Sequence, residues 1–441
     1  MRSSHTLVRV ETTFDEDNLV PNAGLQVPAA LAQKLGVAEL VDERVKLPKG
    51  VAGRANCGTK AMTVIGAMLA GADSIDDVDV LRAGAAPELF DQIRAPSTIG
   101  TWLRAFNWAS VRMLDAVSRG VLARAWQAGL GPELDADLTI DLDSTVCEVY
   151  GVKKQGAKFG YTKVRGYHPL LATLAGTGEV LHARMRGGNA GSARGAASLV
   201  RETISRVRDA GATGALTLRA DSAFYSKTFI RACRDHDARF SVTVKQLKPI
   251  KEAIAAIPDA DWVPIDYWLE GGADVAETTY TAFKNTKDQV ELRLIVRRVR
   301  PTPGSQLALD VVFDYHAILT DREGEMLELE ADHRAHAVVE LAIRDVKAGG
   351  LAHVPSGKFN ANAAWLALAI LAHNLARWSL AAAGAAWQHA TTETLRTKLV
   401  AMPARLVHTA RRIKLRAPTN WPWREAFESA LVRIAAIPAP T

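Results

Sequence analysis

Cysteine and aromatic residues are scarce in this chain of 441 residues, and its apolar runs are short. The three cysteines, Cys57, Cys147 and Cys233, lie far apart without any Cys-x-x-Cys pair, which argues against a disulfide framework and a thiolate zinc site. The longest apolar run, residues 363–372, is well short of the roughly 20 residues that a membrane span needs. No signal-peptide pattern opens the sequence. We therefore expect a cytoplasmic protein, nucleoid-associated when bound to DNA, with no membrane partner.

The charge balance leaves a nucleic-acid partner open. Lys and Arg number 54 against 48 Asp and Glu, which gives a formal net charge of +6. Such an excess permits a polyanionic partner without requiring one. Hydrophobic residues make up 48% of the chain, enough for a sizeable core. The length suits two to four domains at about 100 to 200 residues each.

Helical patterning dominates residues 1–130. In RAPSTIGTWLRAFN, Ser97 or Thr98 can cap a helix whose apolar stripe leaves Arg104 on a polar face. This pattern fits the second helix of a helix-turn-helix, whose polar face enters a DNA major groove. An ordinary capped helix in an all-helical region is the alternative. We expect residues 1–130 to be a mainly helical, DNA-binding region.

From residue 131 the pattern changes to strands that alternate with helices, which is typical of an α/β fold. We expect this α/β domain in two parts, residues 131–245 and 313–385. A β-rich insertion, residues 246–312, separates them, and a basic helical region, residues 386–441, ends the chain.

The opening strand of the α/β domain lies in LTIDLDSTVCEVY, residues 138–150, and carries two acids on one face. Strand side chains alternate, so Asp141 and Asp143 project opposite to the leucine and isoleucine side chains. Carboxylates on the inner part of a strand are costly unless water, a partner or a cation takes up their charge. A solvated strand edge is the alternative. The pattern does not choose between the two aspartates.

Two later acids complete a possible metal site. Asp221 follows a predicted strand in GALTLRADSAFYS, and Glu340 lies in a mostly apolar turn of a predicted helix. Hard oxygen ligands from three places suit Mg²⁺. Two such ions can activate water or a 3′-hydroxyl beside a phosphodiester and stabilise the leaving oxygen. For Glu340 alone, a surface carboxylate paired with a neighbouring cation is the alternative.

A basic loop, GVKKQGAKFGYTKVRGYHP, follows the opening strand. Its cations include Lys153, Lys154 and Lys158, and it contains no acid. Alone, such a loop is more often solvated. Beside a cluster of acids that need a polyanionic substrate, phosphate contact is favoured.

These stretches occur together in a recognisable order. DLDST, RADSAFYS and HRAHAVVELAIRDVK, with GADSIDDVDVLR and FNANAAWLALAILAHNLARW, resemble the bacterial DDE transposases of the insertion-sequence thirteen-eighty family, relatives of the insertion-sequence-four group. The resemblance covers nearly the whole chain. It implies a ribonuclease H-like catalytic domain, dependence on Mg²⁺ with Mn²⁺ as a substitute, and cut-and-paste movement of an element bounded by terminal inverted repeats. By motif match it implies Asp143, Asp221 and Glu340 as catalytic acids and metal ligands.

The third motif departs from the related signature Tyr-x-x-Arg-x-x-x-Glu-x-x-x-x-x-x-Lys. Glu340 and Lys347 match it, whereas His333 and His336 occupy the Tyr and Arg positions. Histidine can donate to phosphate but is only partly charged at neutral pH. The resemblance implies contacts of Lys347, His333 and His336 with double-stranded DNA, and a homodimer when two element ends are bound.

Two other functions remain open from the sequence. A catalytically impaired or domesticated transposase-derived DNA-binding protein would explain the two histidines. A metallohydrolase could bind a transition metal through His333, His336 and Glu340, although the chain has no His-Glu-x-x-His motif.

The match to Asp-Ser-Thr selects Asp143 as the first acid, which gives a test on the opening strand. Asp143→Asn is expected to abolish DNA strand cleavage, because it removes a metal ligand, whereas Asp141→Asn should only weaken it. A cleavage assay on element-end DNA with Mg²⁺ measures both. The reverse ranking would move the first ligand two residues back.

Overall fold

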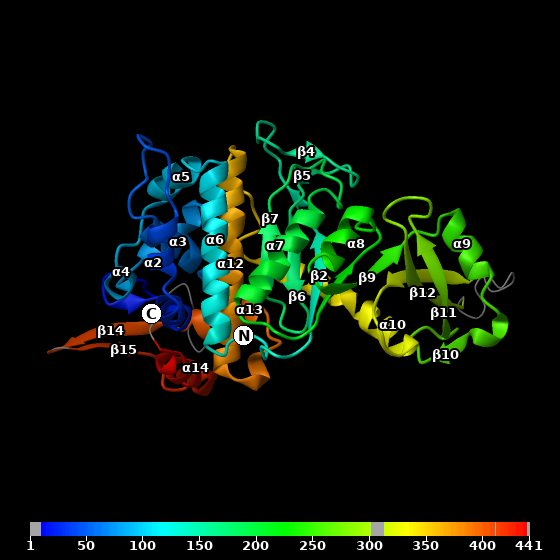
Figure 1. Cartoon of the computed structure of the whole chain (residues 1–441). Coiled ribbons are helices and arrows are strands. Elements are labelled where there is room, and N and C mark those ends of the chain that lie inside the picture. Colours follow the sequence, from blue (N-terminus) through cyan, green and yellow to red (C-terminus); the bar gives the residue numbers. More distant parts are fainter. Residues whose placement is uncertain (1–9, 301–312, 411, 439–441) are drawn as a thin grey trace.

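A nine-stranded mixed sheet and a group of helices beside it make up this α/β protein (Figure 1). The computed structural model describes residues 10–300, 313–410 and 412–438. The order of the strands across the sheet is β10 (Val263–Ile265), β11 (Ala273–Ala282), β12 (Val290–Val299), β13 (Asp314–Thr320), β9 (Ala238–Val244), β8 (Leu216–Ala220), β2 (Leu138–Ser144), β6 (Leu170–Leu174) and β7 (Val180–Arg184).

The α-helices alternate with these strands or precede them. They are α1 (Gln26–Lys34), α2 (Val37–Arg44), α3 (Cys57–Ala70), α4 (Ala86–Leu89), α5 (Pro96–Arg104), α6 (Trp108–Gln127), α7 (Ala196–Asp209), α8 (Lys227–Arg234), α9 (Lys248–Ala255), α10 (Met326–Arg334), α11 (Val339–Ala348), α12 (Phe359–Ala383), α13 (Thr392–Leu395) and α14 (Arg424–Ala436). A 3₁₀ segment, Ala335–Val338, joins α10 to α11.

Strand β2 is the third strand from the β7 edge of the sheet. It pairs in parallel with β8, and β8 pairs in parallel with β9, whereas β6 and β7 run antiparallel on the other side of β2. The strand predicted before Asp221 is β8, and the hairpin β6–β7 and strand β9 lie on either side of β2 and β8 in this part of the sheet. Apolar residues on both faces of the central strands reflect helices packed on either side.

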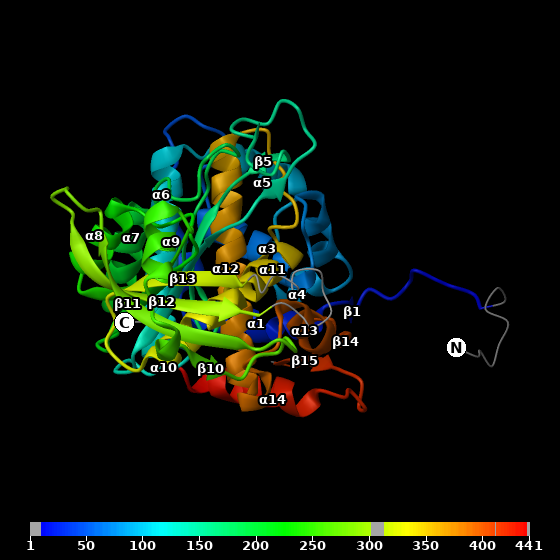
Figure 2. The same ribbon diagram turned by 90° about the vertical axis from the view of Figure 1, so that its right-hand side faces the viewer.

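The predicted β-rich insertion continues the same sheet. Strand β13 pairs antiparallel with β9, and β12, β11 and β10 follow in turn. The region also contains helix α9, which the sequence analysis did not predict. Residues 301–312 of the predicted insertion lie outside the described residues. In Figure 2 these outer strands cross in front of α12.

Helix α12 is the central packing element of the helical part. It contacts α1, α3, α5, α6 and α14 as well as β7, so helices from both ends of the chain bury their apolar faces against it. Apolar side chains surround it on all sides, including the buried Trp365 and Trp378. In the described ranges it is the one helix with the length and hydropathy of a membrane span, and 83% of that apolar window is buried inside the protein.

One polar side chain of α12 pairs with the edge of the sheet. Asn374 Oδ1 accepts a hydrogen bond of 2.9 Å from the Val180 N–H, and Asn374 Nδ2 donates one of 2.9 Å to the Val180 carbonyl. The amide thus satisfies both backbone groups of an edge residue, as a neighbouring strand would. This pair fixes α12 against β7.

Two smaller sheets lie outside the main one. In the first, β3 (Cys147–Glu148) and β4 (Lys158–Phe159) flank β5 (Arg165–Tyr167), within the basic loop after β2. In the second, β1 (Leu19–Val20) pairs with β14 (Ala404–Thr409), and β14 pairs with β15 (Arg412–Arg416). Strands β14 and β15 differ from the helical prediction for the end of the chain.

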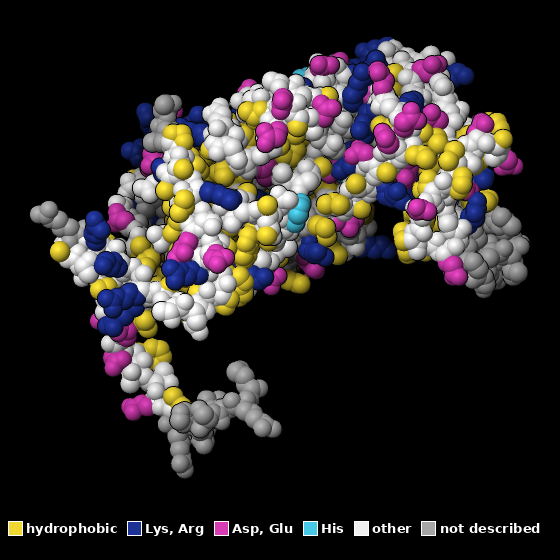
Figure 3. All heavy atoms as spheres, turned by 90° about the horizontal axis from the view of Figure 1, so that it is seen from below, with side chains coloured by type: hydrophobic (Ala, Val, Ile, Leu, Met, Phe, Trp, Pro, Cys, Tyr) yellow, Lys and Arg dark blue, Asp and Glu magenta, His cyan; other side chains and the backbone are white. Residues whose placement is uncertain are grey.

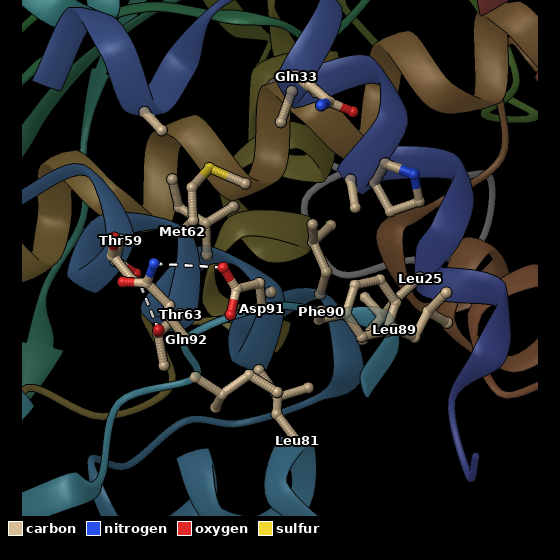
Figure 4. Close-up of a pocket in the computed structure, with 18 of the residues that line it drawn as sticks. Leu25, Gln33, Thr59, Met62, Thr63, Leu81, Leu89, Phe90, Asp91 and Gln92 are labelled. Carbon is tan, nitrogen blue, oxygen red and sulfur yellow. Dashed lines mark hydrogen bonds between the residues drawn. The ribbon is translucent and has the colours of Figure 1, made fainter. Parts of the chain in front are cut away.

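A cavity of about 560 Å³ lies among the N-terminal helices (Figure 4). Its walls are mostly apolar and include Leu25, Met62 and Phe90, while Asp91 and Gln92 supply polar groups. The three acids of the predicted metal site are not among the lining residues. The cavity is therefore separate from the candidate site.

Replacement of Asn374 tests how α12 is held. Asn374→Leu is expected to lower the free energy of unfolding by about 2–4 kcal/mol, because two buried backbone groups lose their partners. Denaturant and thermal unfolding measure the change. Asn420→Leu, at an exposed position, is the control. Equal stability of the two variants would contradict this role of Asn374.

Candidate active site

The carboxyl ends of two parallel strands bring Asp143 and Asp221 together. Leu142 of β2 lies beside Ala220 of β8, so the two aspartates follow at the same level of the sheet. Asp143 Oδ1 accepts a hydrogen bond of 2.6 Å from the backbone N–H of the next residue. Asp221 Oδ1 accepts a hydrogen bond of 2.9 Å from the backbone N–H two residues further along the chain. Each carboxylate keeps lone pairs for another partner.

Glu340 approaches the same region as the second residue of α11 and is exposed. The pKa of Asp143 is raised to about 6, first by burial and then by the charges of Asp221 and Glu340. The three predicted acids therefore act on one another electrostatically. A divalent cation would relieve this repulsion, and three carboxylates form the oxygen-donor set that Mg²⁺ prefers. The residues present fit such an ion.

A tighter group of potential ligands lies elsewhere. Within the described ranges, Asp115, His182 and Glu202 are the one set of three whose ligand atoms are all within 4.8 Å of one another. The predicted acids therefore stand further apart than this. Burial, with a contribution from Arg206, lowers the pKa of His182 to about 4, so its imidazole is neutral at pH 7.

Arginines already neutralise the carboxylates of this second group. Arg206 contacts Asp115 at 2.5 Å, Arg184 contacts Glu202 at 2.8 Å, and Arg112 lies 3.0 Å from Asp115 and 2.7 Å from Glu202. The cations outnumber the acids, so the group has little electrostatic need of a metal. It is an ion-pair network that joins α6 to β7 and α7. The sequence analysis missed it because its members are distant in the chain and match no motif.

Asp141, the other aspartate of the opening strand, is buried in a network of its own. Its two oxygens accept hydrogen bonds of 2.7 and 2.8 Å from Arg219, and His336 Nδ1 lies 2.8 Å from Oδ1. Burial alone would raise the pKa of Asp141, but hydrogen bonds from His336 and Arg219 outweigh it and lower the pKa. Arg219 also contacts Asp332 of α10 at 3.0 Å. Because both oxygens of Asp141 are occupied, the geometry favours Asp143 as the ligand.

His333 is an anchor to strand β9 in this structure. Its ring nitrogens lie 2.7 Å from Ser241 Oγ and 2.9 Å from Thr243 Oγ1. Burial first, and then electrostatic interaction with His336 and Arg219, lower the pKa of His333 to about 3. A neutral imidazole with both nitrogens engaged has none free for the phosphate contact that the sequence analysis predicted.

The remaining residues of the third motif also bond to the sheet region. Lys347 Nζ donates a hydrogen bond of 3.0 Å to the carbonyl of Val146, just beyond β2. With His333 on β9 and His336 on β2, three side chains hold the helices on either side of Glu340. The predicted DNA contacts of His336 and Lys347 stay predictions, whereas both ring nitrogens of His333 are engaged by β9.

The basic loop after β2 forms a flap, residues 147–167, that contains the small sheet β3–β5–β4. Lys153 and Lys158 are exposed on the flap, whereas Lys154 donates to the carbonyl of Val354. Tyr161 is 74% exposed, an unusual position for an aromatic ring. The flap thus offers exposed lysines, and it follows in the chain the strand that carries Asp143.

Arg104 lies at the end of α5 in less favourable surroundings for DNA. It lines a cleft of about 880 Å³ whose other residues include Asp76, Asp79 and Glu148. These carboxylates would repel a phosphate backbone. The helix itself begins at Pro96, which suits a first helical position, and not with the serine or threonine cap expected from the sequence.

Comparisons with known proteins identify a family for this chain. The family described as transposase DDE domain group 1 matches residues 3–439. No match is found among curated proteins. Among solved structures, the chain is similar to a cryo-EM structure of the piggyBac transposase synaptic complex with hairpin DNA, with 10% identity, a TM-score of 0.40, and coverage of 96% of this chain and 86% of that chain.

The raised pKa of Asp143 predicts a link between metal, pH and stability. The pKa of Asp143 is about 6 in the folded protein and 3.8 ordinarily, so folding favours the protonated carboxyl group. The protonated group therefore contributes to the free energy of unfolding. This contribution is fully present below about pH 4 and is lost as the pH rises through 6. At about 1.36 kcal/mol per pKa unit, the ionised carboxylate costs at most about 3 kcal/mol at pH 8.

We therefore expect Asp143→Asn to raise the thermal midpoint of the metal-free protein at pH 8 and not at pH 4. Mg²⁺ should raise the midpoint of the wild type at pH 8 and that of the variant less. Calorimetry with and without Mg²⁺ measures both effects, and the exposed Asp261→Asn is the control. Equal Mg²⁺ stabilisation of wild type and Asp143→Asn would remove Asp143 from the metal site.

Proposed function

Because this chain belongs to the transposase DDE domain group 1 family, we propose that it is a transposase that cuts and joins DNA by metal-dependent phosphodiester hydrolysis and strand transfer. The observation that carries the proposal is the placement of Asp143 and Asp221 at the carboxyl ends of two neighbouring parallel strands. We propose that Glu340, from helix α11, completes the metal site with them. The substrate we propose is the double-stranded end of a mobile element, bounded by terminal inverted repeats.

The arrangement of the central strands supports a ribonuclease H-like catalytic domain. Five strands lie side by side in the order β7, β6, β2, β8 and β9. Strand β6 runs antiparallel to both of its neighbours, β7 and β2. Strands β8 and β9 run parallel to β2. In this arrangement the first acid lies on the central strand and the second on its parallel neighbour. A ribonuclease H-like catalytic domain is also what the resemblance to the insertion-sequence thirteen-eighty family implies.

In the mechanism we propose, Asp143, Asp221 and Glu340 would hold Mg²⁺, with Mn²⁺ as a substitute, and the metal would activate water or a 3′-hydroxyl and stabilise the leaving oxygen. The buried Asp141 orients His336 through Nδ1. No hydrogen bond from the described residues reaches Nε2 of His336, so this nitrogen is free to donate to a phosphate oxygen when the ring is protonated on both nitrogens.

DNA positioning falls to the cations around the acids. Lys153 and Lys158 on the flap are exposed and free to meet phosphates beside the cleaved bond. Two copies of the chain, one on each element end, would bring both ends to one target. A homodimer on DNA is therefore part of the proposal.

The structure bears differently on the two alternative functions. A transition-metal hydrolase loses support, because His333 uses both ring nitrogens and His336 uses Nδ1 in contacts within the protein. An impaired or domesticated DNA-binding protein keeps its support, since the Tyr and Arg of the related signature are absent. It predicts DNA binding without cleavage.

Substitution of the second and third acids tests the catalytic proposal. Asp221→Asn and Glu340→Gln are each expected to reduce cleavage of element-end DNA at least about 10³-fold, since loss of a metal ligand removes several kcal/mol of transition-state stabilisation. Glu328→Gln, at an exposed site on α10, is the matched control. Cleavage that survives in both variants would reject the three-acid mechanism. Binding by a wild-type protein that cleaves with neither Mg²⁺ nor Mn²⁺ would favour the domesticated alternative.

A further inference from the structure

The hairpin β14–β15 extends from the helical side of the protein beside α14 (Figure 1). Its two strands pair antiparallel, with Arg405 opposite Arg416 and Thr409 opposite Arg412. Ala410 in the turn has a φ of 40°. Strand β1 pairs only with residues 404–405, so the rest of the hairpin is a two-stranded ribbon that presents side chains on two faces.

Four cations of the hairpin share one of these faces. Residues directly opposite each other lie on the same face, and so does every second residue along a strand. Arg405 and Arg416 are opposite each other, and Lys414 and Arg412 follow at alternate positions on β15. We call this the cationic face; all four side chains belong to exposed residues. Figure 3 shows dark-blue side chains gathered where the hairpin leaves the body, at the left-hand edge.

The other face fixes the orientation of the hairpin. Leu406 is buried, and Leu415 opposite it packs with a small apolar cluster that includes Val20 and Ala86. Burial of the leucines turns their face toward the body. The cationic face is thereby directed away from this apolar cluster.

The cationic face lacks the acids that would neutralise it. Arg405 lies 3.3 Å from Glu16, but Arg412, Lys414 and Arg416 form no ion pair with any residue that the structure describes. The sequence has no Asp or Glu between Glu393 and residue 425. Like charges directly across a ladder are destabilising. An arrangement of this kind gains stability when an external polyanion binds.

We propose that the cationic face of the β14–β15 hairpin is a DNA-contacting surface that grips the phosphates of a duplex away from the acidic site. The inference rests on the proposed function, which supplies DNA as the partner. It concerns a region of the protein that takes no part in the metal chemistry. At about 3.3 Å per residue, residues 412–416 span roughly 13 Å. A two-stranded ribbon fits the major groove, about 12 Å wide, and its cations can reach the phosphates at the groove edges.

The test uses the salt dependence of DNA binding by the full chain. The triple variant Arg412→Gln, Lys414→Gln, Arg416→Gln removes three charges. Each phosphate contact contributes about 0.9 to the slope of log K against log salt, so the slope should become shallower by about 2.7. Binding is measured without divalent metal on an element-end duplex and on an unrelated duplex. A shallower slope on both identifies backbone contact, and one on the end duplex alone identifies contact specific to the ends; either supports the proposal.

Two further variants separate charge from folding. Arg412→Lys with Arg416→Lys keeps the charge and should keep the slope. Gln at Lys251, Lys284 and Lys287, three exposed lysines elsewhere, removes equal charge and should leave the slope unchanged. The thermal midpoint of the hairpin variant should stay equal or rise, because repulsion is relieved. An unchanged slope in the hairpin variant, or an equal loss in the distant-lysine variant, overturns the proposal.

Two more readouts distinguish this inference from its premise and from self-association. Wild-type cleavage of the end duplex tests the proposed function independently of the slope. If the wild type does not cleave but the hairpin variant has a shallower slope, the DNA-contacting surface is supported and the transposase proposal is rejected. If the wild type cleaves and the slope is unchanged, the transposase proposal is supported and the DNA-contacting surface is rejected. Sedimentation measures the oligomeric state. A variant that changes only self-association shows that the face meets a second copy of the chain, which also overturns the proposal.

Discussion

The buried ion pair between Arg219 and Asp141 is the contact on which the candidate site depends. Their side chains are 3% and 2% exposed, and together they connect β8, β2, His336 and Asp332 of α10. Loss of one partner of such a pair leaves an uncompensated buried charge, at a cost of about 3–5 kcal/mol. Because β2 and β8 each carry one acid at their ends, and α10 leads to the helix that carries the third, the pair fixes the framework of all three. The acids themselves repel one another and contribute nothing to holding their positions.

Two clusters of similar composition have opposite electrostatic character. In the network of Asp115 and Glu202, arginines supply the positive charge, and hydrogen bonds from His182, Arg112 and Arg184 overcome the effect of burial and hold the pKa of Glu202 well below its usual range. Asp143, Asp221 and Glu340 form no ion pair with any residue that the structure describes, and the pKa of Asp143 is raised. The first cluster is tightly spaced and internally neutralised, as a structural joint should be. The second cluster is wider, and its negative charge is not neutralised within the protein. This is expected of a site that binds a cation. Close spacing of ligand types is therefore a poor guide in this protein, and the local balance of charge is a better one.

Much of the fold could be predicted from the sequence, but the contacts of individual side chains could not. Alternation along residues 138–144 and the apolar runs before Asp221 identify strands, because period two is a local property of the chain. The same alternation in residues 404–409 and 412–416 indicates strands, yet the clustered basic residues led to a helical prediction. His333 was assigned to DNA because the motif places it there; whether a helix turns a side chain toward solvent or toward Ser241 is set by tertiary packing. The register that places Arg219 opposite Asp141 is equally absent from local patterns.

The position of α12 in the chain has a consequence for biosynthesis. The N-terminal helices bury their apolar faces against a helix that begins only at residue 359, and β1 near the start pairs with β14 near the end. A growing polypeptide thus holds exposed apolar helices until more than three quarters of it has left the ribosome. A product truncated upstream of residue 359 would lack this central packing element and would leave the apolar faces of α1, α3, α5 and α6 that pack on it exposed. Folding of the N-terminal helices therefore waits for a segment that is synthesised late.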